Sequence, residues 1–404
     1  MKKFRVLSLA LALTLCFSLT ACGNNGGGKE SSAPGSTGSA SGDTIKVGLL
    51  GNTTGASAQY GNAVFNGAKL YVEELNAAGG INGKTVELVE YDEEGDAAKA
   101  QTGYGSLVDS GVTAILGSVL TSPTVAVAPL ADEDGMPMIT ASATATSVTY
   151  NEETNTVYGH MFRSCFIDPF QGSTMASFAS AELGAKTAAI LTNNGSAYSQ
   201  GLTDAFVEKA AEVGLTIVAQ ETYAGDDTVD FQSQLTNIAA KNPDVLFVPD
   251  YYNIVALVAQ QAASTGVKAT LLGADGWDTV LNYVNDASVL ENAYFCAGYS
   301  AKDDSEMVQA FLKSYEEKYG AEPDMFAAQA YDAAHILCDA LKAAEDQGLE
   351  TGSTEYKDAV TAAMKATDAD FVTGHVTYDE YNNPQKTAAI INIKGGEYEF
   401  WGRY

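Results

Sequence analysis

Short apolar-rich segments alternate with longer mixed segments in the first third of the chain. The short segments predict strands at 45–50, 85–91, 113–117 and 137–140. Between the strands, one helix should end before Gly79-Gly80, and Asp96 is placed to cap the next, which runs to about residue 108. Ser122 followed by Pro123 predicts the cap and the first residue of a third helix. This βαβαβαβ order predicts a parallel sheet with helices on both faces.

The same alternation begins again near residue 187 and predicts a second lobe of like architecture. It gives strands at 187–192, 215–221, 244–248 and 269–272, with helices at about 199–213, 229–240 and 253–265. From about residue 298 the chain predicts helices near 305–319, 325–344 and 355–366 and strands near 374–378, 388–393 and 397–401. A tail of that size must pack back on both lobes, so we expect the chain to cross between them more than twice.

The predicted fold class is therefore α/β, with two doubly wound parallel-sheet lobes joined by a multi-crossing hinge. About 360 residues follow Gly42, which suits two domains better than one core. We expect lobe I to comprise residues 44–166 and 299–385, and lobe II residues 167–298 and 386–404.

The N-terminal segment predicts export. Basic residues at positions 2, 3 and 5 precede an apolar run over 6–19, which is shorter than the roughly 20 residues of a spanning helix. The ending Leu19-Thr20-Ala21-Cys22 resembles the bacterial lipoprotein processing site, where the new N-terminal cysteine carries lipid. Residues 1–21 are thus expected to be a lipoprotein signal peptide, although an ordinary cleavable signal with a chance cysteine is the alternative. The Gly- and Ser-rich stretch 22–43 should act as a flexible tether.

Composition narrows the function by exclusion. The formal net charge of −29 argues against nucleic acid or an anionic membrane surface as a partner. The chain has no Gly-x-Ser-x-Gly elbow, no phosphate loop and no His-Glu-x-x-His, and Cys165, Cys296 and Cys338 fit neither a metal site nor a dense disulfide framework. We therefore expect no catalysis, no cofactor and no metal.

Polar and aromatic residues cluster after the predicted strands, where ligands of open parallel sheets bind. In the first unit these residues are Thr53, Gln59, Tyr60, Ser118, Thr121, Ser122, Ser142 and Thr144; in the second they are Tyr198, Asp250, Tyr251, Asp275 and Trp277. Hydroxyls and a helix start in the first unit suit a carboxylate or other anion. A carboxylate and aromatic rings in the second suit an ammonium and an apolar side chain. A zwitterion with an apolar tail would satisfy both units, although each residue taken singly is compatible with ordinary loop chemistry.

The chain also resembles the type I periplasmic binding proteins, specifically the leucine/isoleucine/valine-binding branch of ABC importers. The resemblance covers nearly all of 45–400. It rests on an ordered set of motifs at 45–48, 58–61, 79–83, 139–144, 162–164, 171–172, 198–201 and 374–379, among which Gly-Gly-Ile-Asn-Gly is moderately specific.

The resemblance implies a role for individual residues. A carboxylate-binding hydroxyl falls on Thr121, or on Ser122 if the register slips by one, and a loop pair falls on Ser142 and Thr144. The remaining implied positions are Tyr60 beside the ligand side chain, Asp168 at the first crossing between lobes, and Tyr198, Tyr251 and Asp275 in the second lobe. Two departures from the family concern the pocket: Asp275 stands where glutamate is usual, and Trp277 replaces a small residue.

The resemblance implies a lipid-anchored solute-binding protein that holds a small amino acid, branched-chain in the family's manner, between two closing lobes and delivers it to an ABC permease and its ATPase. It implies a monomer anchored to the outer face of the membrane only through Cys22. An amide, urea or aromatic acid as ligand, or a sensor as partner, remains the alternative within binding proteins. An extracellular enzyme is the alternative from another class.

Overall fold

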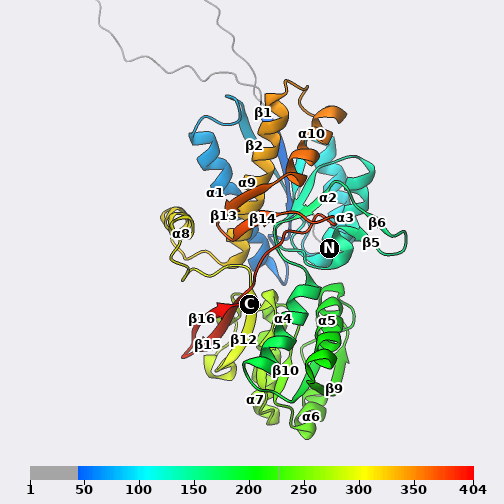
Figure 1. Ribbon diagram of the computed structural model, residues 1–404, viewed down its shortest axis with the longest axis vertical. Coiled ribbons are helices and arrows are strands. Elements are labelled where there is room, and N and C mark those ends of the chain that lie inside the picture. Colours follow the sequence, from blue (N-terminus) through cyan, green and yellow to red (C-terminus); the bar gives the residue numbers. More distant parts are fainter. Residues whose placement is uncertain (1–43, 226) are drawn as a thin grey trace, which may run out of the picture. The chain divides into compact units, whose positions relative to one another are not determined.

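The computed structural model describes residues 44–225 and 227–404. The predicted signal peptide, the tether and Cys22 lie outside the described residues. The described part contains two large sheets, each covered by its own set of helices (Figure 1). We call the elements packed on the five-stranded sheet the first lobe and those packed on the seven-stranded sheet the second lobe.

The sheet of the first lobe is parallel throughout, with strand order β2-β1-β3-β4-β7. Its strands are β1 (Thr44–Gly51), β2 (Thr85–Asp92), β3 (Ala114–Leu116), β4 (Met138–Thr140) and β7 (Met161–Arg163). Its helices are α1 (Ala58–Ala77), α2 (Ala97–Asp109) and α3 (Thr121–Glu133), joined later in the chain by α8 (Glu306–Tyr319), α9 (Met325–Asp346) and α10 (Thr354–Lys365). Two small antiparallel pairs, β5 (Tyr150–Asn151) with β6 (Thr156–Val157) and β13 (Asp368–Phe371) with β14 (Gly374–Thr377), complete it.

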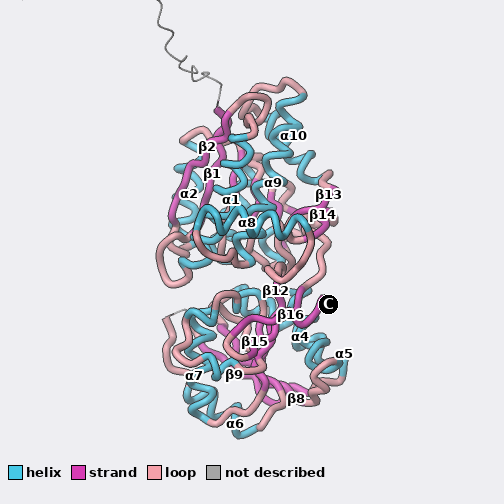
Figure 2. The backbone as a smooth tube through the Cα atoms, turned by 90° about the vertical axis from the view of Figure 1, so that its left-hand side faces the viewer, coloured by secondary structure: helices cyan, strands magenta, loops and turns pink. Residues whose placement is uncertain are grey.

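The sheet of the second lobe has the order β16-β15-β12-β11-β10-β8-β9. Five strands are parallel: β8 (Thr187–Asn193), β9 (Thr216–Tyr223), β10 (Val245–Phe247), β11 (Thr270–Gly273) and β12 (Ala293–Ala297). The last strands, β15 (Ala389–Lys394) and β16 (Glu397–Arg403), add antiparallel at one edge. The helices of this lobe are α4 (Asp168–Ala181), α5 (Ala197–Val213), α6 (Gln232–Lys241) and α7 (Tyr252–Thr265), and Figure 2 shows α5, α6 and α7 around its strands.

The chain passes between the lobes three times within the described residues: between β7 and α4, between β12 and α8, and between β14 and β15. The expected α/β class, the parallel sheets and the hinge of more than two crossings are thus confirmed. The residue boundaries given above for the two lobes stay a prediction. None of the helices in the described ranges combines the length and apolarity that crossing a bilayer requires.

Helix starts show where local sequence signals worked and where they did not. Asp96 caps α2 as predicted, because its side chain accepts a hydrogen bond of 2.8 Å from the Lys99 N–H. The prediction for the third helix is wrong by two residues: α3 begins at Thr121, and its cap position is Leu120, whose side chain makes no capping bond. Pro123 is still tolerated, since it lies in the first turn, where N–H groups have no partner inside the helix.

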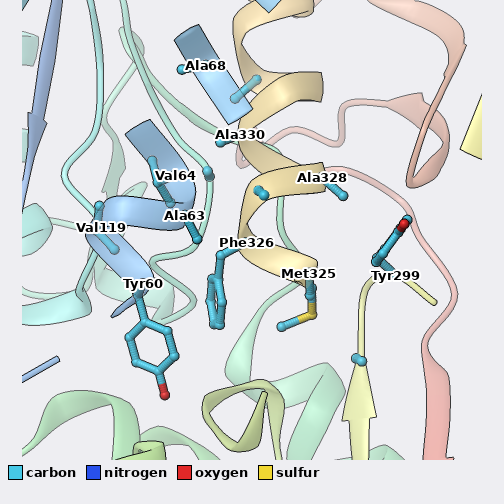
Figure 3. Close-up of a cluster of buried hydrophobic side chains, with 14 of the residues drawn as sticks. Tyr60, Ala63, Val64, Ala68, Val119, Tyr299, Met325, Phe326, Ala328 and Ala330 are labelled. Carbon is cyan, nitrogen blue, oxygen red and sulfur yellow. The ribbon is translucent and has the colours of Figure 1, made fainter. Parts of the chain in front are cut away.

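Helices α1 and α9 lie in close contact although they are separated by some 250 residues of sequence. Gly67 of α1 faces the α9 backbone, and a Cβ atom at this position would lie 2.1 Å from the carbonyl oxygen of Ala327. Glycine is therefore required for this approach. Figure 3 shows the apolar side chains that this pairing buries, including Val64 and Ala68 of α1 and Ala330 of α9.

Candidate functional site

One small cavity is lined by residues of both lobes. Its walls are formed by Tyr60, Val119, Leu120, Thr121, Ser142, Tyr198, Tyr251, Asp275, Gly276 and Phe326, around an empty volume of ≈ 240 Å³. The first-lobe residues come from the starts of α1, α3 and α9 and from the loop after β4. The second-lobe residues come from the starts of α5 and α7 and from a 3₁₀ turn, Asp275–Trp277, that follows β11. The cavity thus lies where the carboxyl ends of strands from both sheets meet, as expected for α/β folds.

The first lobe brings hydroxyl and backbone N–H groups to the cavity. Thr121 is the first residue of α3, so its N–H and the next one have no partner inside the helix. The Ser142 hydroxyl donates to the carbonyl oxygen of Val119 at 2.7 Å, which fixes the loop after β4 against the loop before α3. Helix starts attract negative charge, so this wall suits a carboxylate.

The second lobe brings a carboxylate and two aromatic rings. Asp275 is 2% exposed, and its Oδ1 accepts hydrogen bonds from the Tyr198 hydroxyl at 2.7 Å and from the Gly276 N–H at 2.9 Å. The Gln171 side chain lies next to this residue, since its Oε1 accepts the Asp275 N–H at 2.9 Å. The rings of Tyr198 and Tyr251 stack with centroids 4.9 Å apart and planes 13° from parallel. This wall suits a cation beside aromatic surface.

Burial controls the charge of Asp275. Loss of water raises the pKa of this carboxyl to about 6, although the hydrogen bond from Tyr198 lowers it in part. The carboxylate is therefore ionised at neutral pH but held in a place where a positive partner is absent among the described residues. An ammonium group against this carboxylate would compensate for the lost hydration.

Tyr60 and Phe326 form the apolar part of the cavity wall. Their ring centroids are 4.4 Å apart, and Tyr60 also meets Tyr251 edge-on at 5.6 Å. Figure 3 shows Phe326 beside Tyr60, with the Tyr60 hydroxyl extending beyond the apolar cluster of the first lobe. A hydrocarbon side chain would pack against these two rings.

The structure brings six of the ten ligand-binding candidates to the cavity: Tyr60, Thr121, Ser142, Tyr198, Tyr251 and Asp275. Three others lie outside the lining. Ser122 is exposed on the first turn of α3. Thr144 is buried, and its carbonyl oxygen accepts the Asp168 N–H at 3.0 Å, while Asp168 itself is fully buried at the start of α4. Burial raises the pKa of Asp168 well above its usual range.

Trp277 also lies outside the cavity lining, whereas it was expected among the residues of the pocket. It is fully buried, and its indole N–H donates to the carbonyl oxygen of Val248 at 2.8 Å. The ring covers Gly273, where a Cβ atom would lie 2.1 Å from the indole. The 3₁₀ turn after β11 points Asp275 to the cavity and Trp277 into the core.

Four lining residues were not predicted from the sequence: Val119, Leu120, Gly276 and Phe326. Val119, Leu120 and Gly276 each adjoin a predicted residue and lack polar chemistry, so nothing singled them out. Phe326 follows Asp324, which caps α9 by accepting the Ala327 N–H at 2.9 Å. The sequence shows a helix cap followed by an aromatic residue at this point. It does not show that the start of α9 lies next to the ends of strands that are far away along the chain.

No cluster of three or more metal-ligating side chains occurs among residues 44–225 and 227–404. Cys165, Cys296 and Cys338 are buried and form no disulfide with one another. Burial raises the pKa of the Cys165 thiol to about 12. None of these three cysteines lines the cavity.

Known proteins share both the sequence and the fold. A family model described as periplasmic binding protein matches residues 44–397. The Leu/Ile/Val-binding protein BraC3 of Rhizobium johnstonii is 30% identical over 341 residues, covering 83% of this chain and 88% of that protein. A leucine-, isoleucine-, valine-, threonine- and alanine-binding protein of Pseudomonas aeruginosa is 26% identical over 340 residues, covering 84% of this chain and 86% of that one.

Solved structures agree. The branched-chain amino acid transporter substrate-binding protein LivJ of Streptococcus pneumoniae, in complex with isoleucine, superposes with a TM-score of 0.80 at 33% identity and covers 89% of this chain and 99% of its own. A solute-binding protein of R. palustris in complex with benzoate has a TM-score of 0.79 at 25% identity, covering 89% of this chain and 96% of its own. With the family model matched over almost the whole described chain, this protein belongs to the periplasmic binding protein family.

Proposed function

We propose that the protein is an exported solute-binding protein that captures a small amino acid, branched-chain by preference, and delivers it to an ABC permease. One observation carries this proposal: the buried carboxylate of Asp275 lines the same cavity as Thr121 and the start of α3. A carboxylate on one side and the hydroxyl groups and helix start on the other match the two charges of a zwitterion.

Each part of the ligand then has a partner. The ammonium group pairs with Asp275, beside the stacked rings of Tyr198 and Tyr251. The carboxylate group accepts hydrogen bonds at the start of α3 and near Ser142. The hydrocarbon side chain packs against Tyr60 and Phe326. The names of the relatives above, which bind leucine, isoleucine and valine, support this assignment.

An aromatic acid is the second candidate, because one structural neighbour holds benzoate. Asp275 argues against it. Benzoate has no positive charge, and bringing its carboxylate into a small cavity with a buried, ionised carboxyl costs free energy. An amino acid offers Asp275 the partner that benzoate lacks.

Calorimetry with purified protein tests the proposal. Isoleucine, leucine and valine should bind, and benzoate should not. The variant Asp275→Asn keeps the shape of the side chain but removes its charge, so the desolvated ammonium group loses its charged partner. The binding free energy should weaken by about 2–5 kcal/mol, and affinity should fall at least tenfold. Asp204→Asn, an exposed change on α5 of the same lobe, is the matched control and should bind like the wild type. Near-native affinity in Asp275→Asn would contradict the amino-acid assignment.

The remaining parts of the proposal concern the whole chain. Residues 44–166 with 299–385 and residues 167–298 with 386–404 act as two lobes that close on the ligand, and the closed form is what the permease recognises. The protein acts as a monomer, and its partners are the permease and the ATPase that drives it. Lipid on Cys22 holds it at the outer face of the cell membrane, with no catalytic step of its own.

A further inference from the structure

Two tyrosines, one from each lobe, reach across to the backbone of the opposite lobe. The Tyr60 hydroxyl, at the start of α1, donates to the carbonyl oxygen of Gly276 at 2.6 Å and accepts the Tyr252 N–H at 3.1 Å. The Tyr252 hydroxyl, at the start of α7, donates to the carbonyl oxygen of Ala56 at 3.1 Å and accepts the Gln59 N–H at 3.4 Å. Each tyrosine therefore bonds to the segment from which the other one comes.

These hydrogen bonds give the N-terminal ends of two helices an acceptor for one of their N–H groups. The first N–H groups of a helix have no partner inside it. The cap position of α1 is Ser57, whose side chain makes no capping hydrogen bond, and that of α7 is Tyr251, an aromatic residue outside the usual capping types. Here Tyr252 accepts an N–H from α1 and Tyr60 accepts one from α7, so each helix start gains an acceptor from the other lobe.

The two tyrosines are also packed as a pair. Each is 1% exposed, and their rings meet edge-on with centroids 4.8 Å apart. Burial raises the pKa of both phenols, so both remain protonated and able to donate at any physiological pH. The contact of Tyr60 with Gly276 also ties α1 to the residue next to Asp275, which orients the turn that carries the carboxylate.

We propose that Tyr60 and Tyr252 form a reciprocal clasp that stabilises the closed arrangement of the lobes, with Tyr252 acting as a positioning residue for ligand capture. This rests on the proposed function, since it assumes that ligand binding and closure occur together. Tyr60 lines the cavity, whereas Tyr252 does not. Tyr252 therefore acts on the ligand indirectly, through Tyr60 and the arrangement of the lobes.

The clasp predicts the size of the affinity loss when one of its hydroxyl groups is removed. In an open form the same hydroxyls would bond to water, so only the modest net advantage of a protein–protein hydrogen bond is gained on closing. Removing the Tyr252 hydroxyl should thus weaken binding by about 3- to 10-fold. Because Tyr252 does not touch the cavity, the factor should be the same for isoleucine, leucine and valine.

Calorimetry on Tyr252→Phe with these three amino acids tests the clasp. Tyr104→Phe is the matched control: the Tyr104 hydroxyl bonds to Leu130 and Asp134 within the first lobe, so its loss should lower the melting temperature but leave affinity unchanged. Tyr60→Phe, which removes the other half of the clasp, should also weaken binding and serves if Tyr252→Phe does not fold. In X-ray scattering, Tyr252→Phe should need more ligand than the wild type to reach the compact form.

The outcomes separate this proposal from the proposed function. If the wild type binds and Tyr252→Phe weakens all three ligands by one common factor, the clasp is supported. Equal affinity of Tyr252→Phe and wild type, or a loss that differs between ligands by more than about threefold, would overturn the clasp while leaving the amino-acid assignment intact. Failure of the wild type to bind any of the three would overturn the proposed function and, with it, the clasp that rests on it.

Discussion

Asp275 gives the site its expected dependence on pH. Burial raises its pKa to about 6, whereas an ammonium partner favours the ionised form and lowers the pKa again. The ligand therefore binds to the ionised carboxyl. Above pH 6 that form is already present, and below pH 6 a proton must first leave, so affinity decreases as the pH falls.

We expect isoleucine to bind about tenfold more weakly at pH 5 than at pH 7, which calorimetry at both values would measure. Asp278 and Asp324, whose pKa values burial also raises, lie near the boundary of the lobes and could add their own dependence. The variant Asp275→Asn separates these contributions. Any pH dependence of isoleucine affinity that remains in this variant comes from groups other than Asp275. If wild type and Asp275→Asn change equally with pH, Asp275 is not the group that titrates.

At the scale of single residues, the sequence predicted which residues carry the polar groups of the site better than it predicted where their side chains point. Asp275, Tyr198 and Thr121 were recognisable because each follows a predicted strand and carries a hydrogen-bonding group. Trp277 satisfied the same criteria, yet it points into the core, because the turn after β11 is a 3₁₀ helix and Gly273 leaves room for the indole. Neither the turn type nor that space can be read from an apolar–polar pattern.

At the scale of elements, the contact of α1 with α9 depends on one missing side chain. Gly67→Ala would place a Cβ atom 2.1 Å from the carbonyl oxygen of Ala327, so the helices must separate, at a cost of about 1–3 kcal/mol of unfolding free energy. Gly105, exposed within α2, has no atom within 4 Å of the place that a Cβ would take, so Gly105→Ala should instead stabilise by about 0.5–1 kcal/mol. Chemical denaturation measures the change in unfolding free energy of each variant, which should be negative for Gly67→Ala and positive for Gly105→Ala. Stabilisation by Gly67→Ala would refute the close packing.

The elements themselves were largely predictable where they are long and apolar. Helix α9 and strands β1, β2 and β8 appear within a few residues of the expected ranges. In α9, β1 and β8, burial of a whole strand or helix face leaves a continuous pattern, whereas β2 has only Val86 buried. The strands β7 and β12 were not expected from the sequence. The role of Phe326 could be recognised only from the tertiary contact between α9 and the strand ends of both lobes.

At the scale of the whole molecule, the two tasks of the chain are assigned to different segments. Ligand capture depends on the cavity between the lobes, all of whose lining residues lie between 60 and 326. Membrane attachment is proposed to depend on Cys22, which lies outside the described residues. The predicted tether, residues 22–43, would let the lobes close without moving the anchor.

This separation predicts that Cys22→Ser changes location without changing binding. A single serine oxygen cannot take the place of the thiol in lipid attachment, so the variant should leave the membrane fraction and appear in the soluble or secreted fraction. Its affinity for isoleucine, measured on the purified protein, should equal that of the wild type, because no cavity residue is altered. Asp275→Asn is the reciprocal control, and it should stay with the membrane while losing affinity. If Cys22→Ser still fractionates with membranes, attachment does not run through a lipid on this residue.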